Sequence, residues 1–66
     1  MEVKLVEVGL FKLPGLIIET DISNERLEEM RDWAKEHKTG REIDVDRKMW
    51  VFRNEKQRNF FIMRWS

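Results

Sequence analysis

The sequence predicts an α+β domain with the element order ββαββα, in which an antiparallel sheet carries two helices packed on one face. Three observations predict this class. Short apolar runs with strand character lie before and after a segment with helical periodicity. A second segment with helix signals closes the chain. No linker rich in Pro, Gly or Ser divides the chain, so residues 1–66 are expected to form a single domain.

The first two strands are expected to pair as an antiparallel hairpin. Residues 2–8 alternate between apolar and charged side chains, and the run 16–20 is rich in β-branched residues. Between them, Pro14 presets φ for the first central position of a type II turn, and Gly15 accepts the positive φ of the second. We therefore expect the turn of this hairpin at residues 13–16.

A helix is expected over about residues 24–38. Ser23 is a good N-cap, and Ile22 and Leu27 occupy the two positions of a hydrophobic staple. Gly40 fits as the residue that ends the helix. Residues spaced by three and four positions predict one face of this helix, namely Leu27, Met30, Ala34 and His37.

Two further strands follow. Residues 41–46 alternate, with Ile43 and Val45 on one side and acidic residues on the other, which is typical of a half-buried strand. Residues 49–53 have apolar side chains on both sides, which predicts a central strand. One of its faces would meet the helices, and the other would meet a partner protein or a second subunit.

The last segment, residues 55–65, has an ambiguous period. As a helix it would be capped by Asn54 and would place Phe61 and Trp65 on one side, whereas as a strand it would place Phe61 and Phe60 on opposite sides. The cap and the polar residues 55–59 favour the helix.

Acidic and basic residues are unevenly distributed along a chain whose net charge is zero. Residues 1–46 hold seven Lys and Arg against twelve Asp and Glu, a net charge of −5. Residues 47–66 hold six Lys and Arg against one Glu, a net charge of +5. Such segregation can orient partners or subunits, whereas packing of the two parts against each other would neutralise it.

The chain is short for a self-sufficient hydrophobic core. A domain of about 60 residues buries only about 60% of the surface that its unfolded chain exposes. Disulfides, metals or oligomerisation often supply the missing stability. The chain has no Cys, and its single His, His37, cannot make a structural zinc site. Self-association remains, so we expect a homodimer.

The residue inventory argues against an enzyme. There is no Cys, His37 is the only His, and Ser23 is better used as a helix cap. Asp44 and Asp46 would point the same way on a strand, but such pairs usually face solvent. The three Gly residues are isolated and form no phosphate-binding loop. We therefore expect no catalytic residues, no metal site and no cofactor.

The sequence also carries no sign of a membrane partner. No apolar run approaches the length that spans a bilayer, and Met1 is followed by a charged, alternating stretch rather than by an export signal. A cytoplasmic location is the expectation that follows.

Two kinds of binding protein remain. A protein-interaction module would use Trp and Arg, which are enriched among the residues that dominate protein interfaces. A single-stranded nucleic-acid binder would use the basic C-terminal third, because such proteins combine basic groups with stacking aromatic rings. In the first case the apolar anchors would be Trp50, Phe52 and Trp65, and the directional charges would be Arg53, Arg58 and Arg64.

The end of the chain, FRNEKQRNFFIMRW, resembles a pattern found in small uncharacterised proteins of tailed bacteriophages. Met63 stands where Leu is usual in that pattern, and Arg58 stands where Ala is usual. The resemblance implies an α+β fold and a virus-encoded protein that acts in the cytoplasm of an infected bacterium, often on a host protein. It implies no enzymatic activity. The residues that carry it are Phe52, Asn54, Glu55, Phe61, Met63, Arg64 and Trp65.

Overall fold

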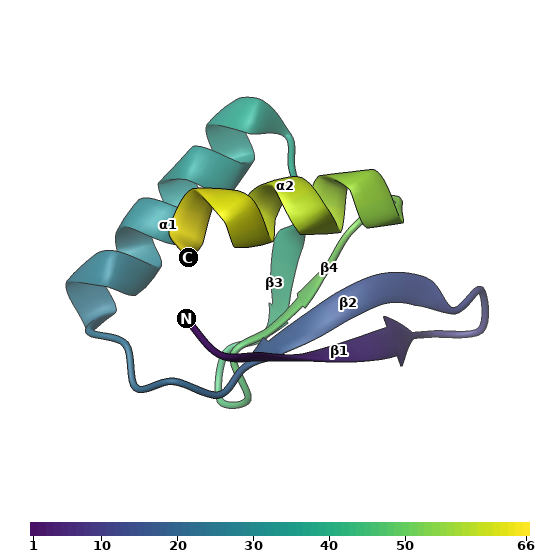
Figure 1. The fold of residues 1–66 in the computed structure, drawn as a ribbon, viewed down its shortest axis with the longest axis horizontal. Coiled ribbons are helices and arrows are strands. Elements are labelled where there is room, and N and C mark those ends of the chain that lie inside the picture. Colours follow the sequence, from purple (N-terminus) through teal and green to yellow (C-terminus); the bar gives the residue numbers. More distant parts are fainter.

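A computed structural model describes all 66 residues as one four-stranded antiparallel sheet and two helices. Both helices lie on the same side of the sheet (Figure 1). The predicted α+β class and the order ββαββα are confirmed. The strand order across the sheet is β1-β2-β4-β3, so β4 is a central strand, as predicted. The elements are β1 (Val3–Val8), β2 (Leu13–Ile18), α1 (Asn24–His37), β3 (Arg41–Asp44), β4 (Met49–Val51) and α2 (Glu55–Trp65).

The hairpin of β1 and β2 forms, but its turn lies earlier than the predicted residues 13–16. The loop consists of residues 9–12, in which the Lys12 N–H donates to the Gly9 carbonyl at 3.2 Å. Gly9 and Lys12 both have positive φ, 76° and 51°. The loop projects beyond the rest of the sheet at the right of Figure 1. The predicted turn position is therefore wrong, because Gly9 rather than Gly15 supplies the left-handed backbone.

Pro14 and Gly15 lie inside β2 for a different reason. The Pro14 carbonyl accepts the Phe52 N–H at 2.8 Å, and Phe52 follows the last residue of β4. Pro14 therefore lies where the pairing with β4 ends, and its missing N–H is tolerated there. Gly15 is buried, and a Cβ at this position would lie 2.6 Å from Cγ2 of Val8 and 2.8 Å from the carbonyl oxygen of Trp50. Gly15 is therefore needed for the close approach of β1 and β4.

Helix α1 begins as predicted. The Ser23 side chain caps it by accepting the Arg26 N–H at 3.2 Å. Its C-terminal end differs from the prediction, because Lys38 and not Gly40 adopts the left-handed capping conformation, with φ 51°. His37 is exposed, and its Nδ1 lies 2.9 Å from the Trp33 carbonyl oxygen. The buried residues of α1 are Leu27, Met30 and Ala34.

Strand β3 turns the opposite way from the expectation. Glu42 faces the helices, because it pairs with the buried Trp50, whereas Ile43 is 40% exposed and Val45, beyond the strand end, is 64% exposed. An irregularity between Glu42 and Asp44 interrupts the pairing with β4. A carboxylate can face inward here because α1 offers it a partner: Nε of Arg31 lies 2.6 Å from Oε1 of Glu42.

Helix α2 resolves the ambiguity of the last segment. It covers Glu55–Trp65, so the helical alternative is confirmed and the strand alternative is wrong. Asn54 caps it by accepting the Gln57 N–H at 2.9 Å.

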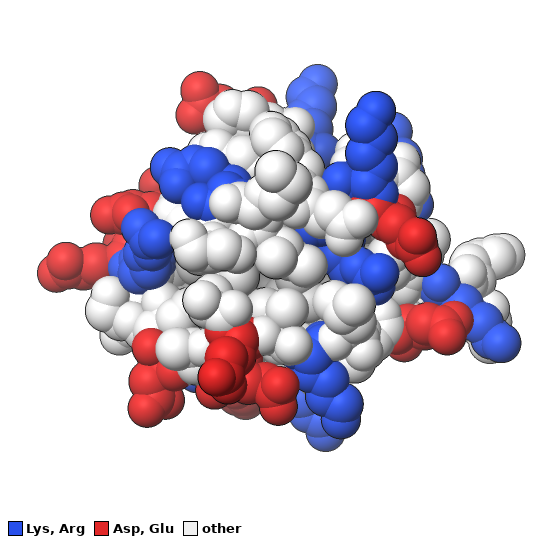
Figure 2. All heavy atoms as spheres, viewed as in Figure 1, with Lys and Arg blue, Asp and Glu red and all other residues white.

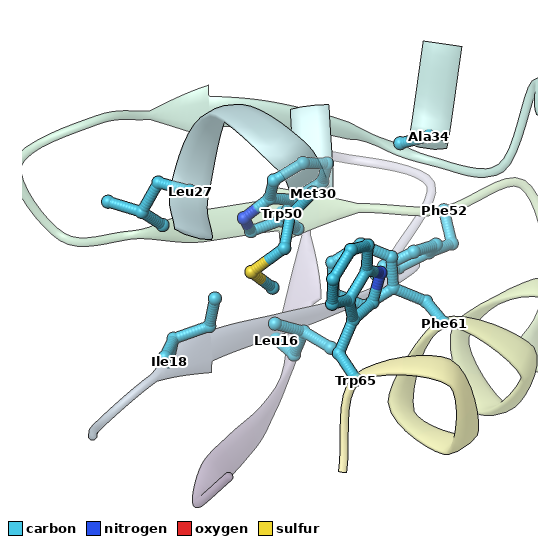
Figure 3. Close-up of a cluster of buried hydrophobic side chains, with 9 residues drawn as sticks. All are labelled: Leu16, Ile18, Leu27, Met30, Ala34, Trp50, Phe52, Phe61 and Trp65. Atoms are coloured by element: carbon cyan, nitrogen blue, oxygen red, sulfur yellow. The ribbon is translucent and has the colours of Figure 1, made fainter. Parts of the chain in front are cut away.

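One hydrophobic core lies between the sheet and the two helices (Figure 3). The sheet contributes side chains from β2 and β4, and the largest rings come from β4, the residue after it, and α2. Phe61 lies between Trp50 and Phe52, with ring centroids 4.8 and 5.3 Å away. The nine buried apolar residues are Leu16, Ile18, Leu27, Met30, Ala34, Trp50, Phe52, Phe61 and Trp65.

Candidate interaction surface

The three aromatic residues predicted to anchor a partner are part of the core. Trp50, Phe52 and Trp65 are all buried, with exposed fractions of 4% or less. Their prediction as exposed anchors is wrong, because a chain of this size needs its large rings to fill the space between sheet and helices. Trp33, which the sequence did not single out, is half-buried at the edge of this core.

The three predicted arginines lie in different settings. Arg58 is half-buried, and its guanidinium donates to the Gly15 carbonyl at 3.4 Å. Arg64 is exposed, with its guanidinium carbon 4.2 Å from the ring centroid of Trp65. Arg53 is exposed just after β4. Arg53 and Arg64 can reach a partner, whereas Arg58 is partly used to hold α2 against β2.

The face of the sheet opposite the helices carries a group of apolar side chains. Side chains alternate between the two faces along a strand, and directly paired residues share a face. Leu16 and its partner Trp50 point toward the helices, so the residues on either side of them point away. We call the apolar residues that point away the uncovered sheet face: Val6, Val8, Leu13, Ile17, Met49 and Val51.

None of the residues of the uncovered sheet face belongs to the core cluster, and all are partly accessible. Charged residues border the face on both sides. Lys4 lies beside Ile17 on the β1 side, and Arg41 and Asp44 lie on the β3 side. An apolar centre with a charged rim is the usual anatomy of a protein interface. The two apolar faces of β4 indicated this surface in the sequence, although the contributions of β1 and β2 were missed.

The tip of the β1–β2 hairpin is a second exposed apolar feature, which was not predicted from the sequence. Leu10 is 98% exposed and Phe11 is 89% exposed. Gly9 is the signal in the sequence that indicates this loop, because Gly tolerates the positive φ that a turn requires. A turn that begins at Gly9 places Leu10 and Phe11 in the loop.

A third feature is a row of aromatic and basic side chains along the junction of the helices. The ring of Trp33 stacks on His37 at 4.6 Å and lies 5.4 Å from the ring of Phe60. Trp33 also packs against Trp65 in a T-shaped arrangement, with ring centroids 6.0 Å apart, and the Arg26 guanidinium carbon lies 4.7 Å from the Trp65 ring centroid. These contacts hold the two helices together, so they have a structural use independent of any ligand.

The strongest electrostatic contact joins α1 to β3. The Glu42 side chain is only 7% exposed, and the Arg31 guanidinium meets it at 2.6 Å. This hydrogen bond raises the pKa of Arg31 above its ordinary value, so the guanidinium stays charged at any accessible pH. The second carboxylate oxygen of Glu42 is buried and has no hydrogen-bond partner in the protein.

The surface offers no deep cavity. The largest depression, about 810 Å³, is open to solvent along α2 beside Phe60 and Met63, and a smaller one of about 440 Å³ lies between α1 and β3, with Arg31, Lys35, Lys38 and Arg41 around it. No group of three or more His, Asp or Glu side chains is close enough to hold a metal ion. No helix combines the length and the apolar character that crossing a bilayer requires.

On the face shown in Figure 2, the charges that are segregated in the sequence lie close to one another. Figure 2 shows acidic and basic side chains interspersed over the face in view, with no continuous basic area. The arrangement fits the expectation that packing of the two parts of the chain neutralises the segregation. A basic track that could follow a nucleic-acid backbone is not visible on this face.

Comparisons with protein-family models, with curated proteins and with solved structures found no match for this chain. The resemblance of its C-terminal residues to small proteins of tailed bacteriophages therefore stays a prediction.

Proposed function

We propose that this chain is a small non-enzymatic interaction module that works as a homodimer and docks a protein of the infected bacterial host in the host cytoplasm. The uncovered sheet face is the observation that carries the proposal. A sheet face rich in Val, Ile and Leu is stabilised by packing against another layer of structure. The apolar residues of the uncovered sheet face have no such layer within this chain. The viral origin and the host location rest on the C-terminal resemblance alone.

The chemistry of the face indicates the kind of partner. The partner would present an apolar patch of matching size, because the centre of the face has no hydrogen-bonding side chain. The partner would also carry charges that meet Lys4 on one side and Arg41 and Asp44 on the other. Such rim charges give orientation more than affinity.

A single-stranded nucleic acid is the alternative partner. The alternative loses support because Trp50, Phe52 and Trp65 are buried and cannot stack on bases. Phe60 and Phe11 are the only exposed Phe residues, and they lie on different elements, α2 and the hairpin loop. The protein partner is therefore the proposal that we adopt.

A capture experiment with matched variants tests the proposal. Ile17→Lys places a charge at the centre of the uncovered sheet face, and Met63→Lys makes the same chemical change at a 77% exposed position on α2. We expect a host protein to be retained in near-stoichiometric amount by the wild type and by Met63→Lys, and to be lost with Ile17→Lys. Circular dichroism would establish that both variants are folded.

Two outcomes would contradict the proposal. One is retention of the same host protein by Ile17→Lys, which would place the contact elsewhere. The other is capture that disappears after nuclease treatment, together with affinity for single-stranded DNA that falls steeply between low and physiological salt. That result would instead support the nucleic-acid alternative.

A further inference from the structure

Strand β1 has a free edge. It pairs with β2 on one side, and no strand or loop pairs with its other side. The strand is six residues long, pairs with β2 without irregularity and contains no Pro. Regular edge strands of this kind present a row of unpaired N–H and C=O groups that can accept another strand.

The other edge of the sheet is poorly suited to pairing. Strand β3 has four residues, three of which are charged, and its pairing with β4 is irregular between Glu42 and Asp44. Short, charged and irregular strands are the features by which proteins block sheet edges. An added strand would therefore choose β1.

The hydrogen-bond pattern shows which groups of β1 point outward. The Glu19 N–H donates to the Glu2 carbonyl at 2.9 Å, so Glu2 directs its carbonyl toward β2. In an antiparallel pair this orientation alternates along the strand. The even-numbered residues of β1 therefore bond to β2, and the outward groups are those of Val3, Leu5 and Glu7.

Leu5 lies at the centre of these three residues. It is opposite the buried Leu16 and points to the helix side of the sheet, yet it is 55% exposed. A two-fold axis through Leu5 would pair Leu5 with Leu5 of a second copy, and Val3 with Glu7 of that copy. All three outward residues would then be paired, with about six hydrogen bonds in total. No like charges would lie directly opposite each other.

There is room for the helices in this arrangement. Helix α2 contacts β2, the strand next to the edge. The β2 strands of two copies would be three strand spacings apart, about 14 Å. Packed helices need only about 8–10 Å between their axes. The two α2 helices would therefore lie side by side above Leu5 without a clash.

We propose that two copies of this chain pair through their β1 strands to form a continuous eight-stranded antiparallel sheet, with the four helices on one face. The inference rests on the homodimer of the proposed function and names the surface that makes it. In this dimer the two uncovered sheet faces lie side by side on the opposite face of the joined sheet.

The dimer also gives the docking face a sufficient size. Four strands of up to six residues present roughly 300–400 Å² on one face. A stable interface buries about 800 Å² on each partner. Two joined faces would offer roughly 600–800 Å², so the dimer brings the docking face close to the usual size.

A single cysteine provides a direct test, because the chain has no native Cys. In the proposed register the two Leu5 Cα atoms are about 5.5 Å apart, within the range of a disulfide. Leu5→Cys is therefore expected to form a disulfide-linked dimer readily under mild oxidation. Lys4→Cys, one residue away, would place its two copies diagonally at about 8 Å, too far for a bond. Ile43→Cys on β3 is the control for random collisions.

Sedimentation equilibrium tests the same pairing without cross-linking. Leu5→Pro removes an outward N–H that no group of the same copy accepts, so we expect a folded protein whose dimer dissociation constant rises about 100-fold. Leu5→Lys serves as a second variant, since it leaves the backbone unchanged and opposes two like charges at the centre of the contact. Ile17→Lys, which disrupts the docking face alone, is expected to remain dimeric.

Three results would overturn the edge pairing. In the first, the wild-type chain stays monomeric at millimolar concentration. In the second, the dimer dissociation constant is unchanged by Leu5→Pro and Leu5→Lys. In the third, Lys4→Cys or Ile43→Cys cross-links as fast as Leu5→Cys. None of them would exclude docking of a host protein on a single copy, because that contact is tested by Ile17→Lys. Conversely, if no host protein is captured in any assay, the cross-linking and sedimentation experiments still test the edge pairing.

Discussion

Gly40 lies directly against the ring of Phe52, so closely that a Cβ at position 40 would fall far inside van der Waals contact with two ring carbons. Gly40 also has a φ of 76°, which L-residues with side chains rarely adopt. The residue follows α1 and Thr39, leads into β3, and allows Phe52 to fill the core. Two independent requirements for glycine therefore meet at one position.

Gly40→Ala is expected to lower the free energy of unfolding by about 2–4 kcal/mol, from backbone strain and from overpacking against Phe52. Urea unfolding followed by Trp fluorescence would measure it. Gly9→Ala is the matched control, because Gly9 has the same φ of 76° but open space around its Cα. Equal losses for the two variants would show that the contact with Phe52 is not what requires glycine.

Removal of the two members of the Arg31–Glu42 pair should have unequal effects. Arg31→Leu leaves a carboxylate that is 7% exposed without its partner, and we expect a loss of about 2 kcal/mol or more. Glu42→Leu leaves an Arg that solvent already reaches, and it removes an oxygen that has no partner. Its cost should therefore be below about 1 kcal/mol.

Chemical unfolding of the two single variants and the double variant would measure this difference. A larger loss for Glu42→Leu than for Arg31→Leu would contradict the argument. Through the raised pKa of Arg31, the guanidinium makes its contribution to stability throughout the neutral and moderately alkaline range, and this contribution is lost only at strongly alkaline pH, as the pH rises through the raised pKa. Ordinary buffers should therefore leave this part of the stability unchanged.

The C-terminal end of α1 should tolerate a stabilising change. Lys38 holds φ at 51°, which costs a residue with a side chain more than it costs Gly. Lys38→Gly is expected to raise the thermal midpoint, with a gain of about 0.5–1 kcal/mol. Lys35→Gly, in the last turn of the same helix, should instead lose about 1 kcal/mol. Calorimetry of both variants would measure their thermal midpoints. Midpoints that shift in the same direction would contradict this prediction.

The hairpin tip should contribute little to folding. Phe11 is 89% exposed, so Phe11→Ala is expected to change the free energy of unfolding by less than about 0.5 kcal/mol. Phe61→Ala removes the same atoms from the centre of the core and should cost about 3–5 kcal/mol, enough to unfold much of the protein. A large loss at Phe11 in dilute solution would mean that its ring is covered in the folded protein.

Local signals in the sequence predicted the elements well. The Ser23 cap and the helical spacing around Leu27 act within a few residues, so they identify α1 without knowledge of the fold, and the Asn54 cap favours a helix for α2. The apolar character of both sides of β4 likewise predicted a central strand with one uncovered face. These features hold because hydrogen-bonded caps and side-chain periodicity depend on near neighbours.

Other features depend on what each segment meets. The sequence alone could not show that Pro14-Gly15 lies inside a strand, because the reason is the approach of Val8 and the Trp50 carbonyl. It could not show that Glu42 points inward, because its partner Arg31 comes from another element.

The prediction of Trp50, Phe52 and Trp65 as exposed anchors failed for the same reason. Periodicity identifies which side chains share a face, but only the packing of helices on the sheet decides which faces are covered. Here that packing buried Trp50, Phe52 and Trp65 and left Leu5, Ile17 and Met49 on accessible surfaces. The sequence by itself determined the elements and their order, and the tertiary structure decided which apolar residues remain available to a partner, because burial is a property of contacts between elements distant in the chain.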